Sequence, residues 1–295
     1  MTDLLHAFVL PELGVRGAAV RLGEGYRQVR AHQSYPDNVG LWLGEALAAA
    51  ALLVTGIKFN GRLSLQLQGG NSVRLLYSEC TSEGDIRGIA RVDAEQPLDT
   101  DFAAAIAGAN LAITLEPHLG RERYQGVVPM SGISLAETLE GYFDQSEQLP
   151  TRILLAADEN EVAGLLLQRL PLLGGNLKVV DPDGWNRAEH LLTTVWAQEL
   201  LATPIDILLH RLFHASPRVD RNPMPLHVRC RCSRLKVAEV LQQLGQTEAI
   251  AATVELGQAE VICEFCGKVY RFDPIEIEQM FRNDAIQAPT PGSLQ

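Results

Sequence analysis

Four cysteines occur as two close pairs in the last quarter of this chain. Cys230 and Cys232 stand one residue apart in "RCRCSR", and after thirty intervening residues Cys263 and Cys266 stand two residues apart in "CEFCG". Two such pairs, each presented by one turn, can supply the four thiolates of a tetrahedral zinc site. Gly267, directly after the second pair, can adopt the positive φ that this kind of turn requires. The spacing therefore predicts one Zn²⁺ bound by all four cysteines.

The spacing leaves the purpose of this zinc site open. A zinc ribbon can simply hold a small domain together, whereas a sensor loses its zinc because an oxidised sulfur is no longer a good ligand. Basic residues beside the pairs can favour thiolates over thiols; they are Arg229, Arg231, Arg234 and Lys268. A thioredoxin-like enzyme is disfavoured because its C-x-x-C motif opens a helix, whereas this one lies in a predicted hairpin.

Composition and charge narrow the classes of protein. The chain has 295 residues, of which 46% are hydrophobic, and a formal net charge of −11. This length predicts two compact units and a connection, and the acidic balance argues against nucleic acid as a partner. The N-terminus lacks the basic region of a secretory signal. The longest apolar stretch, residues 41–59, contains Glu45 and Lys58, which favours a buried helix over a membrane span. We therefore expect a cytoplasmic protein without membrane contact, in which thiols are mostly reduced.

Residues 1–178 alternate between strand and helix patterns, which predicts an α+β domain with one mostly antiparallel sheet and packed helices. Alternating leucines and a Gly69-Gly70 break predict a hairpin from residue 61 to about 79, and two further strands are expected at residues 151–158 and 161–171. Helices are expected from about Asn38 to residue 54, at residues 99–108 with Asp99 or Thr100 as the cap, and at residues 134–147 with a capping box from Ser134 to Glu137.

Residues 179–226, called here the linker segment, have a different pattern. Pro204 interrupts them, and three further prolines close their end. Two helices are predicted, from about residue 186 to 203 and from about 205 to 214. Their apolar side chains form a stripe that is too large to leave in water and must dock on a neighbour. The stripe comprises Leu191, Leu192, Val195, Trp196, Leu200, Leu201, Ile205, Leu208, Leu209, Leu212 and Phe213.

Residues 227–287 hold the four paired cysteines, with a helix predicted at 234–245 and a hairpin at 258–273, and residues 288–295 read as a frayed tail. The fifth cysteine, Cys80, stands apart from the pairs and is expected to be an ordinary partly buried thiol. His210 and His214, four residues apart, are typical of a solvated helix face rather than a metal site. A phosphate-binding G-x-x-x-x-G-K-[ST] loop is absent from the sequence, so nothing in it indicates ATP use.

Taken together, these segments make the chain resemble the redox-regulated heat shock protein 33 family (33 kDa chaperonins), which are bacterial holdase chaperones. The resemblance covers almost the whole chain: "VRLGEGY", "LGEALAAAALL", "GRLSLQLQG", "VRLLYSECT", "RGIAR", "RYQGVVP", "SLAETLEGYFDQSEQLPTR", "CRCS" and "CEFCGKVYRFD" follow one another in the family's order. The two cysteine pairs at this separation are the hallmark of that family. Cys230, Cys232, Cys263 and Cys266 match its four zinc ligands.

The resemblance implies a function without enzymatic activity. In the family, the reduced form binds one Zn²⁺ and is inactive. Oxidation forms disulfides, here Cys230–Cys232 and Cys263–Cys266, zinc leaves, and the C-terminal domain and linker unfold. The exposed surface then holds unfolding client proteins without ATP. The resemblance also implies a monomer when reduced and a dimer when oxidised.

The apolar stripe suggests where clients would bind. Exposed by linker release, Trp196, Leu200, Leu208, Leu212 and Phe213 are the predicted client-binding residues. The competing interpretation is a constitutive zinc-ribbon module that binds protein or nucleic acid without redox control.

Overall fold

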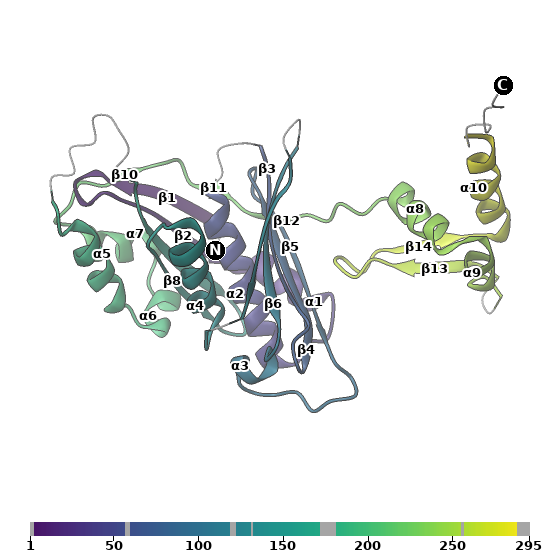
Figure 1. Cartoon of the computed structure of the whole chain (residues 1–295), viewed down its shortest axis with the longest axis horizontal. Coiled ribbons are helices and arrows are strands. Elements are labelled where there is room, and N and C mark those ends of the chain that lie inside the picture. Colours follow the sequence, from purple (N-terminus) through teal and green to yellow (C-terminus); the bar gives the residue numbers. More distant parts are fainter. Residues whose placement is uncertain are drawn as a thin grey trace, which may run out of the picture. The chain divides into compact units, whose positions relative to one another are not determined.

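The computed structural model describes residues 3–56, 60–118, 122–130, 132–171, 181–254 and 257–287, with side chains to residue 282. The chain divides into two compact units, Met1–Arg229 and Cys230–Gln295 (Figure 1). The described part of the linker segment, residues 181–226, lies in the first unit.

The first unit contains two sheets of six strands each. One, called here sheet A, has the order β10-β1-β2-β9-β8, with β11 also pairing with β1, and all its pairs are antiparallel. Its strands are β1 (Leu4–Leu10), β2 (Val15–Leu22), β8 (Thr151–Ala157), β9 (Val162–Arg169), β10 (Val219–Asp220) and β11 (Met224–Pro225).

The other, sheet B, has the order β12-β5-β4-β3-β6-β7, and only its β12–β5 pair is parallel. Its strands are β3 (Gly61–Gln68), β4 (Val73–Thr81), β5 (Asp85–Val92), β6 (Asn110–Pro117), β7 (Tyr124–Pro129) and β12 (His227–Val228). The α+β class and the β3–β4 hairpin are confirmed. The prediction of one sheet is wrong, because the hairpin belongs to sheet B and the strands at 151–171 belong to sheet A. Alternation identifies strands but not the sheet that each joins.

The helix α2 (Asp37–Val54) lies between the two sheets and contacts strands of both (Figure 1). Its length and composition would allow it to cross a membrane, but 72% of it is buried inside the protein. An Ala- and Leu-rich helix that is apolar all round is suited to this place, because small side chains let both sheets pack closely against it. The predicted buried helix is confirmed.

The first unit also contains several short helices. They are η1 (Pro11–Leu13), α1 (Glu24–Ala31), α3 (Phe102–Ala105), α4 (Leu135–Tyr142) and the π-helical turn η2 (Phe143–Glu147). The Ser134 side chain caps α4 as predicted, accepting a hydrogen bond from the Glu137 main-chain nitrogen. The cap predicted for α3 is wrong: Asp101 accepts from the nitrogen of Ala104, whereas Asp99 bonds to residues 71 and 72.

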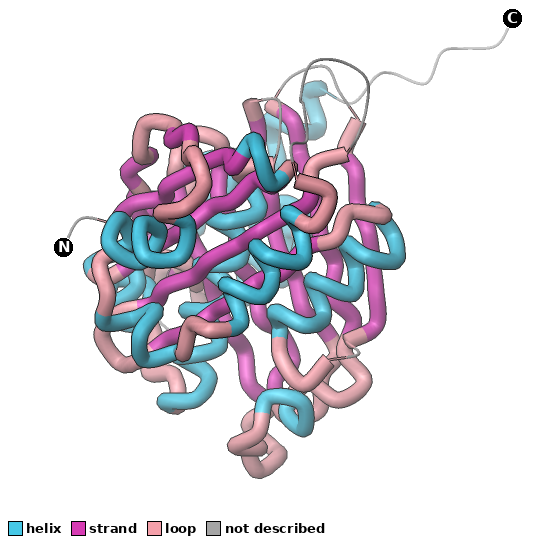
Figure 2. The backbone as a smooth tube through the Cα atoms, turned by 90° about the vertical axis from the view of Figure 1, so that its left-hand side faces the viewer, coloured by secondary structure: helices cyan, strands magenta, loops and turns pink. Residues whose placement is uncertain are grey.

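Three helices of the linker segment cover the face of sheet A that is turned away from α2 (Figures 1 and 2). They are α5 (Gly184–Thr193), α6 (Ala197–Ala202) and α7 (Ile205–Phe213), called here the docked helices. Their apolar side chains share one core with Phe8, Val15, Leu165 and Leu167 of the sheet. The predicted docking of the stripe is therefore confirmed for ten of its eleven members.

Trp196 is the exception, because its side chain is 75% exposed. The helix predicted at 186–203 ends at Thr193, and Trp196 has an extended backbone at the start of α6. The hydroxyls of Thr193 and Thr194 bond back to the carbonyls of residues 190 and 191, and β-branched residues disfavour continuation of a helix. The break rotates Trp196 out of the stripe.

The second unit consists of α8 (Arg234–Leu244), α9 (Gln246–Ala251), the hairpin β13 (Ala259–Ile262) and β14 (Val269–Phe272), and α10 (Pro274–Gln287). The predicted helix and hairpin are confirmed, whereas α9 and α10 were not predicted. The frayed tail predicted at 288–295 lies outside the described residues. Among the described side chains of this unit, seven buried residues form a core: Val237, Leu241, Ala249, Ala259, Tyr270, Phe272 and Ile277.

Candidate metal centre

Two turns of the second unit bring the four paired cysteines together. Cys230 and Cys232 lie in the extended segment before α8, and Cys263 and Cys266 lie in the turn between β13 and β14. Sγ of Cys230 is 3.6 Å from Sγ of Cys263, and Sγ of Cys232 is 3.4 Å from Sγ of Cys266. All four sulfur atoms lie within 4.8 Å of one another.

Local backbone geometry fixes each pair. The nitrogen of Gly267 donates to the carbonyl of Cys263 over 2.8 Å, and Gly267 has a φ of 66°, as the sequence predicted. On the other side, the Ser233 side chain caps α8 by accepting from the nitrogen of Lys236, so the helix begins two residues after Cys232. The cysteines are therefore presented by a tight turn and by a helix start, both of which are defined by short-range bonds.

The four sulfurs fit a zinc ion. Zinc–thiolate bonds of about 2.3 Å in a tetrahedral arrangement place the sulfurs about 3.8 Å apart. The cross-pair separations of 3.6 and 3.4 Å are close to this value. These residues can thus hold a metal ion of the kind that four thiolates select.

A tyrosine that the sequence reading missed contacts this cluster. The hydroxyl of Tyr270 donates to Sγ of Cys232 over 3.1 Å, and the Tyr270 side chain is otherwise part of the small core. Burial raises the pKa of Cys232, but hydrogen bonds, with that from Tyr270 the largest, outweigh it and lower the pKa to about 7. Burial raises the pKa of Cys263, and raises that of Cys266 to about 12. The hydrogen bond from Tyr270 thus lowers the pKa of Cys232, whereas burial dominates at Cys263 and Cys266.

The basic residues beside the pairs have other partners. Arg229 forms an ion pair with Asp85 over 3.4 Å. Arg234 bonds to Glu276 over 2.6 Å and lies 4.2 Å from the centre of the Phe272 ring. The ammonium of Lys268 lies 5.2 Å from the centre of the Tyr270 ring. Arg229 and Arg234 therefore balance carboxylates, and Lys268 lies beside the aromatic residue that bonds to Cys232.

Cys80 and the helical histidines stay outside this site. Cys80 is fully buried in β4, and burial raises the pKa of its thiol. The rings of His210 and His214 are 6.2 Å apart, and both residues are exposed at the end of α7. Within the described part of the chain, the only cluster that could hold a metal through histidine, cysteine or carboxylate groups is the four-cysteine cluster.

Four of the five predicted client-binding residues are buried between the docked helices, to which they belong, and sheet A. Leu200, Leu208, Leu212 and Phe213 are at most 5% exposed and pack toward sheet A, whereas Trp196 faces solvent. In the structure as described, a client could therefore reach only Trp196 of this set.

Arg21 of β2 attaches α6 to sheet A by polar contacts. Its guanidinium donates to the main-chain oxygens of Leu200 over 2.7 Å and Thr203 over 2.6 Å, and also to that of Leu201. It also forms an ion pair with Glu161 over 3.1 Å. The last carbonyls of a helix lack partners within the helix, so a buried cation there satisfies them and interacts favourably with the helix dipole.

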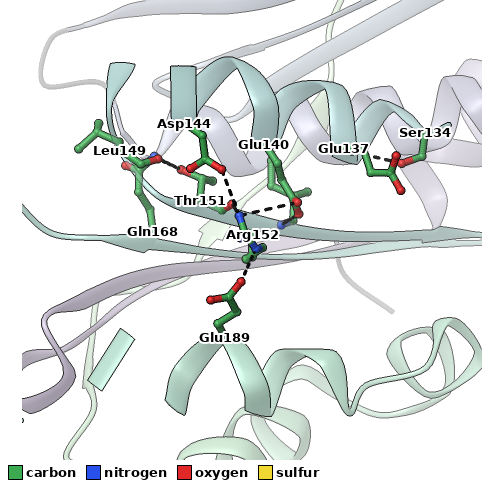
Figure 3. A network of polar contacts seen from close by, with 10 residues as sticks. Ser134, Glu137, Glu140, Asp144, Leu149, Thr151, Arg152, Gln168 and Glu189 are labelled. Carbon is green, nitrogen blue, oxygen red and sulfur yellow. Dashed lines mark hydrogen bonds and ion pairs between the residues drawn. The ribbon is translucent and has the colours of Figure 1, made fainter. Parts of the chain in front are cut away.

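A second polar attachment joins α5 to the opposite end of sheet A (Figure 3). Arg152 of β8 bonds to Glu189 of α5 over 2.6 Å, and on its other side it lies 3.4 Å from Asp144 of η2 and 4.0 Å from Glu140 of α4. Arg152 therefore connects the docked helices with the helices that cover the other face of the sheet.

Comparisons with known proteins indicate the family of this chain. The family model described as Hsp33 protein matches residues 3–273. The 33 kDa chaperonin of Ectopseudomonas mendocina is 42% identical over 292 residues, covering 98% of this chain and 99% of the relative. That of Azotobacter vinelandii is 42% identical over 293 residues, covering 98% and 97%.

A solved structure shares the fold. The crystal structure of the 33 kDa chaperonin from Thermotoga maritima has a TM-score of 0.83 and 23% identity, covering 97% of this chain and 100% of that one. The family model covers most of the chain, and the two relatives at 42% identity cover nearly all of it. The chain therefore belongs to the Hsp33 chaperone family.

Proposed function

We propose that this protein is a redox-regulated, ATP-independent holdase of the cytoplasm and that it is not an enzyme. The observation that carries this proposal is the cluster of four cysteine sulfurs within 4.8 Å of one another, in a unit whose described residues include seven buried core residues. A core of this size supplies little stability, so bound zinc contributes much of the folding free energy, on the order of 10 kcal/mol in zinc-finger peptides.

In the proposed switch, the four thiolates of the reduced, inactive form hold one Zn²⁺. A peroxide accepts two electrons for each disulfide formed, Cys230–Cys232 and Cys263–Cys266, and is reduced to water or an alcohol. Disulfide sulfur is a poor zinc ligand, so zinc leaves. Each disulfide closes a loop of only a few residues and therefore constrains the unfolded chain little. Oxidation thus removes the stabilisation by zinc without replacing it.

The docked helices form the second part of the switch. We propose that unfolding of the second unit is followed by release of the linker segment from sheet A. Release would expose Leu200, Leu208, Leu212 and Phe213, together with the apolar face of sheet A that they now cover. Clients would bind this surface, with Trp196 at its margin, and the oxidised protein would dimerise while the reduced protein stays monomeric.

The decisive experiment compares the reduced zinc-loaded protein with the peroxide-treated protein. Zinc content, free thiols and suppression of aggregation of a heat-denatured client are measured on the same samples. We expect oxidised protein to lose one zinc and four thiols and to suppress aggregation, and size-exclusion chromatography to show a dimer. A Cys80→Ala variant should behave like the wild type, whereas Cys263→Ser with Cys266→Ser should lose zinc without oxidation.

Two outcomes would contradict the proposal. Equal client protection by the reduced and oxidised forms would favour a constitutive zinc-ribbon module, as would tight, salt-dependent binding of nucleic acid by the reduced protein. Peptide mapping of the oxidised protein distinguishes the proposed local disulfides from cross-pair ones, whose sulfurs are also close.

Tryptophan fluorescence can report linker release. Trp185 of α5 is only 9% exposed and packs into the core under the docked helices, so its emission should shift to longer wavelength when they leave. Trp196 is already in solvent and is a poor reporter, and Trp42 lies in α2, so the measurement is made in a background with Trp42→Phe and Trp196→Phe. If zinc were lost while the Trp185 spectrum stayed unchanged, the proposed release of the linker segment would be contradicted.

A further inference from the structure

Three arginines line one cavity of the first unit. The cavity has a volume of about 330 Å³, and its wall includes Arg16, Arg169 and Arg221. Arg16 lies in β2, Arg169 is the last residue of β9, and Arg221 directly follows β10. Three cations around one hollow repel one another, and this cost needs a compensating interaction.

The register of sheet A places these three residues together. Val9 of β1 pairs with Arg16 on one side and with Val219 of β10 on the other. Val15, the neighbour of Arg16, pairs with Arg169 of β9, and the nitrogen of Arg221 donates to the carbonyl of Ala7 over 2.8 Å. Because successive side chains point to opposite faces of a strand, Arg16 and Arg221, which lie opposite Val9 and Ala7, share one face of sheet A, and Arg169 lines the cavity from the end of β9.

Arg16 has a neutral hydrogen-bond partner in place of a carboxylate. Its Nε and Nη2 donate to Oε1 of Gln168 over 2.9 and 2.6 Å, and Nε2 of Gln168 donates in turn to the hydroxyl of Thr151 over 2.7 Å. An amide oxygen orients a guanidinium but does not neutralise it. Burial, and then the charge of Arg221, lower the pKa of Arg16. The Arg16 charge is thus held in place but not balanced by Gln168.

The neighbouring carboxylates are engaged elsewhere. Within the described ranges, none of the three arginines forms an ion pair. Asp220, next to Arg221, pairs with Arg218 over 2.7 Å. Arg16 also lines an adjacent cavity that Glu147 reaches, but the Glu147 carboxylate accepts hydrogen bonds from the hydroxyls of Tyr124 and Tyr142.

We propose that this cavity binds a small phosphate-class oxyanion, such as pyrophosphate, through Arg16, Arg169 and Arg221. Guanidinium groups present paired donors that match phosphate oxygens, and three of them favour a multiply charged anion over chloride. The volume of about 330 Å³ accommodates a group of this size. The site needs neither zinc nor oxidation and thus goes beyond the proposed chaperone switch.

Isothermal titration of the reduced, zinc-loaded full-length protein with sodium pyrophosphate at constant ionic strength tests this proposal. We expect saturable binding of one pyrophosphate per chain. Arg16→Gln and Arg221→Gln should each weaken binding about tenfold or more, because each removes a charge-assisted contact. Arg123→Gln removes an equal charge from an exposed arginine outside the cavity and should leave the affinity unchanged.

Absence of saturable binding would overturn the proposal, and so would equal weakening in the Arg123→Gln control, which would indicate general charge attraction. Circular dichroism shows whether each variant folds. Because Arg221 is exposed, the Arg221→Gln variant remains informative even if replacement of the more buried Arg16 prevents folding. A parallel titration with citrate tests the phosphate class. Weaker binding of citrate supports it, and binding as tight as that of pyrophosphate overturns it.

Discussion

The hydroxyl of Tyr270 donates a hydrogen bond to Sγ of Cys232 over 3.1 Å, so a core residue of the second unit is also a partner of the sulfur cluster. Outer partners of metal ligands typically contribute a factor of 10 to 100 in metal affinity. We therefore expect Tyr270→Phe to bind zinc about tenfold more weakly, measured by competition with a chelator at pH 7. Tyr124→Phe, which removes a hydroxyl from the first unit, is the control. Unchanged zinc affinity in Tyr270→Phe would mean that this tyrosine contributes to packing but not to zinc binding.

Replacement of Arg21 should loosen the docked helices in the reduced protein. Arg21→Gln leaves main-chain oxygens at the end of α6 without a cationic donor, which costs about 1 to 3 kcal/mol. Because local opening follows this free energy, limited proteolysis within residues 181–213 should accelerate at least about fivefold while zinc stays bound.

The matched control is Arg27→Gln on α1, where the arginine side chain is 48% exposed and pairs with Glu24. Its proteolysis should equal that of the wild type. If Arg21→Gln also left cleavage unchanged, α6 would be held by its apolar contacts alone.

The Arg152–Glu189 pair should make only a small contribution to docking. Both side chains are partly exposed, at 31% and 28%, so solvent screens their attraction. A double-mutant cycle with Arg152→Gln and Glu189→Gln should give a coupling energy of about 0.2 to 1 kcal/mol. Urea unfolding followed by tryptophan fluorescence measures it, since all three tryptophans lie in the first unit. A coupling energy of zero would indicate that Arg152 acts only through Glu140 and Asp144.

Glu45 should make the stability of the first unit depend on pH. Burial raises the pKa of this α2 carboxyl from 4.5 to about 7, and the residue lines a cavity of about 410 Å³ beside α5. The folded protein keeps a proton that the unfolded chain releases, so this group's contribution falls as pH rises from 4.5 to about 7. A shift of this size corresponds to up to about 3 kcal/mol.

Glu45→Gln should therefore increase the free energy of unfolding more at pH 8 than at pH 5, measured in urea. Glu83→Gln, at an exposed position, serves as the control and should change neither value. An equal gain at both pH values would show that Glu45 does not titrate in this window.

The clustering of the four cysteines could be predicted from the sequence because the requirement within each pair is local. Two cysteines within one turn and a glycine after Cys266 specify the geometry within a few residues, and the capped start of α4 at Ser134 is local in the same sense. The partner Tyr270 could in principle have been found, because alternation on β14 places it and Phe272 on one face. Its bond to Cys232, however, depends on how the hairpin packs against the segment before α8.

Non-local features were missed for a common reason. The division of the strands between two sheets depends on which strands pair across α2, and periodicity carries no information on this. Trp196 matched the helical spacing of its neighbours, and only the break after Thr193 turned it outward. Arg21 is distant in sequence from the α6 carbonyls that it contacts, and the three cavity arginines lie on different strands or loops. Only the folded chain brings these groups together.

The short strands β10, β11 and β12 lie within ten residues of one another, yet they close one edge of each sheet: β10 and β11 pair with β1 of sheet A, and β12 pairs with β5 of sheet B. Cys230 follows β12 after a single residue. Removal of this segment would leave unpaired main-chain donors and acceptors along β1 and β5.

Hydrogen exchange at the amides of β1 and β5 should therefore accelerate on oxidation and slow again when a client binds, while β4 at the centre of sheet B stays protected. Exchange at β1 and β5 that did not respond to oxidation would mean that the edges stay covered. An extended peptide can add to an open sheet edge through its backbone, whatever its side chains are. Recognition of this kind would let one surface accept many unrelated unfolding sequences.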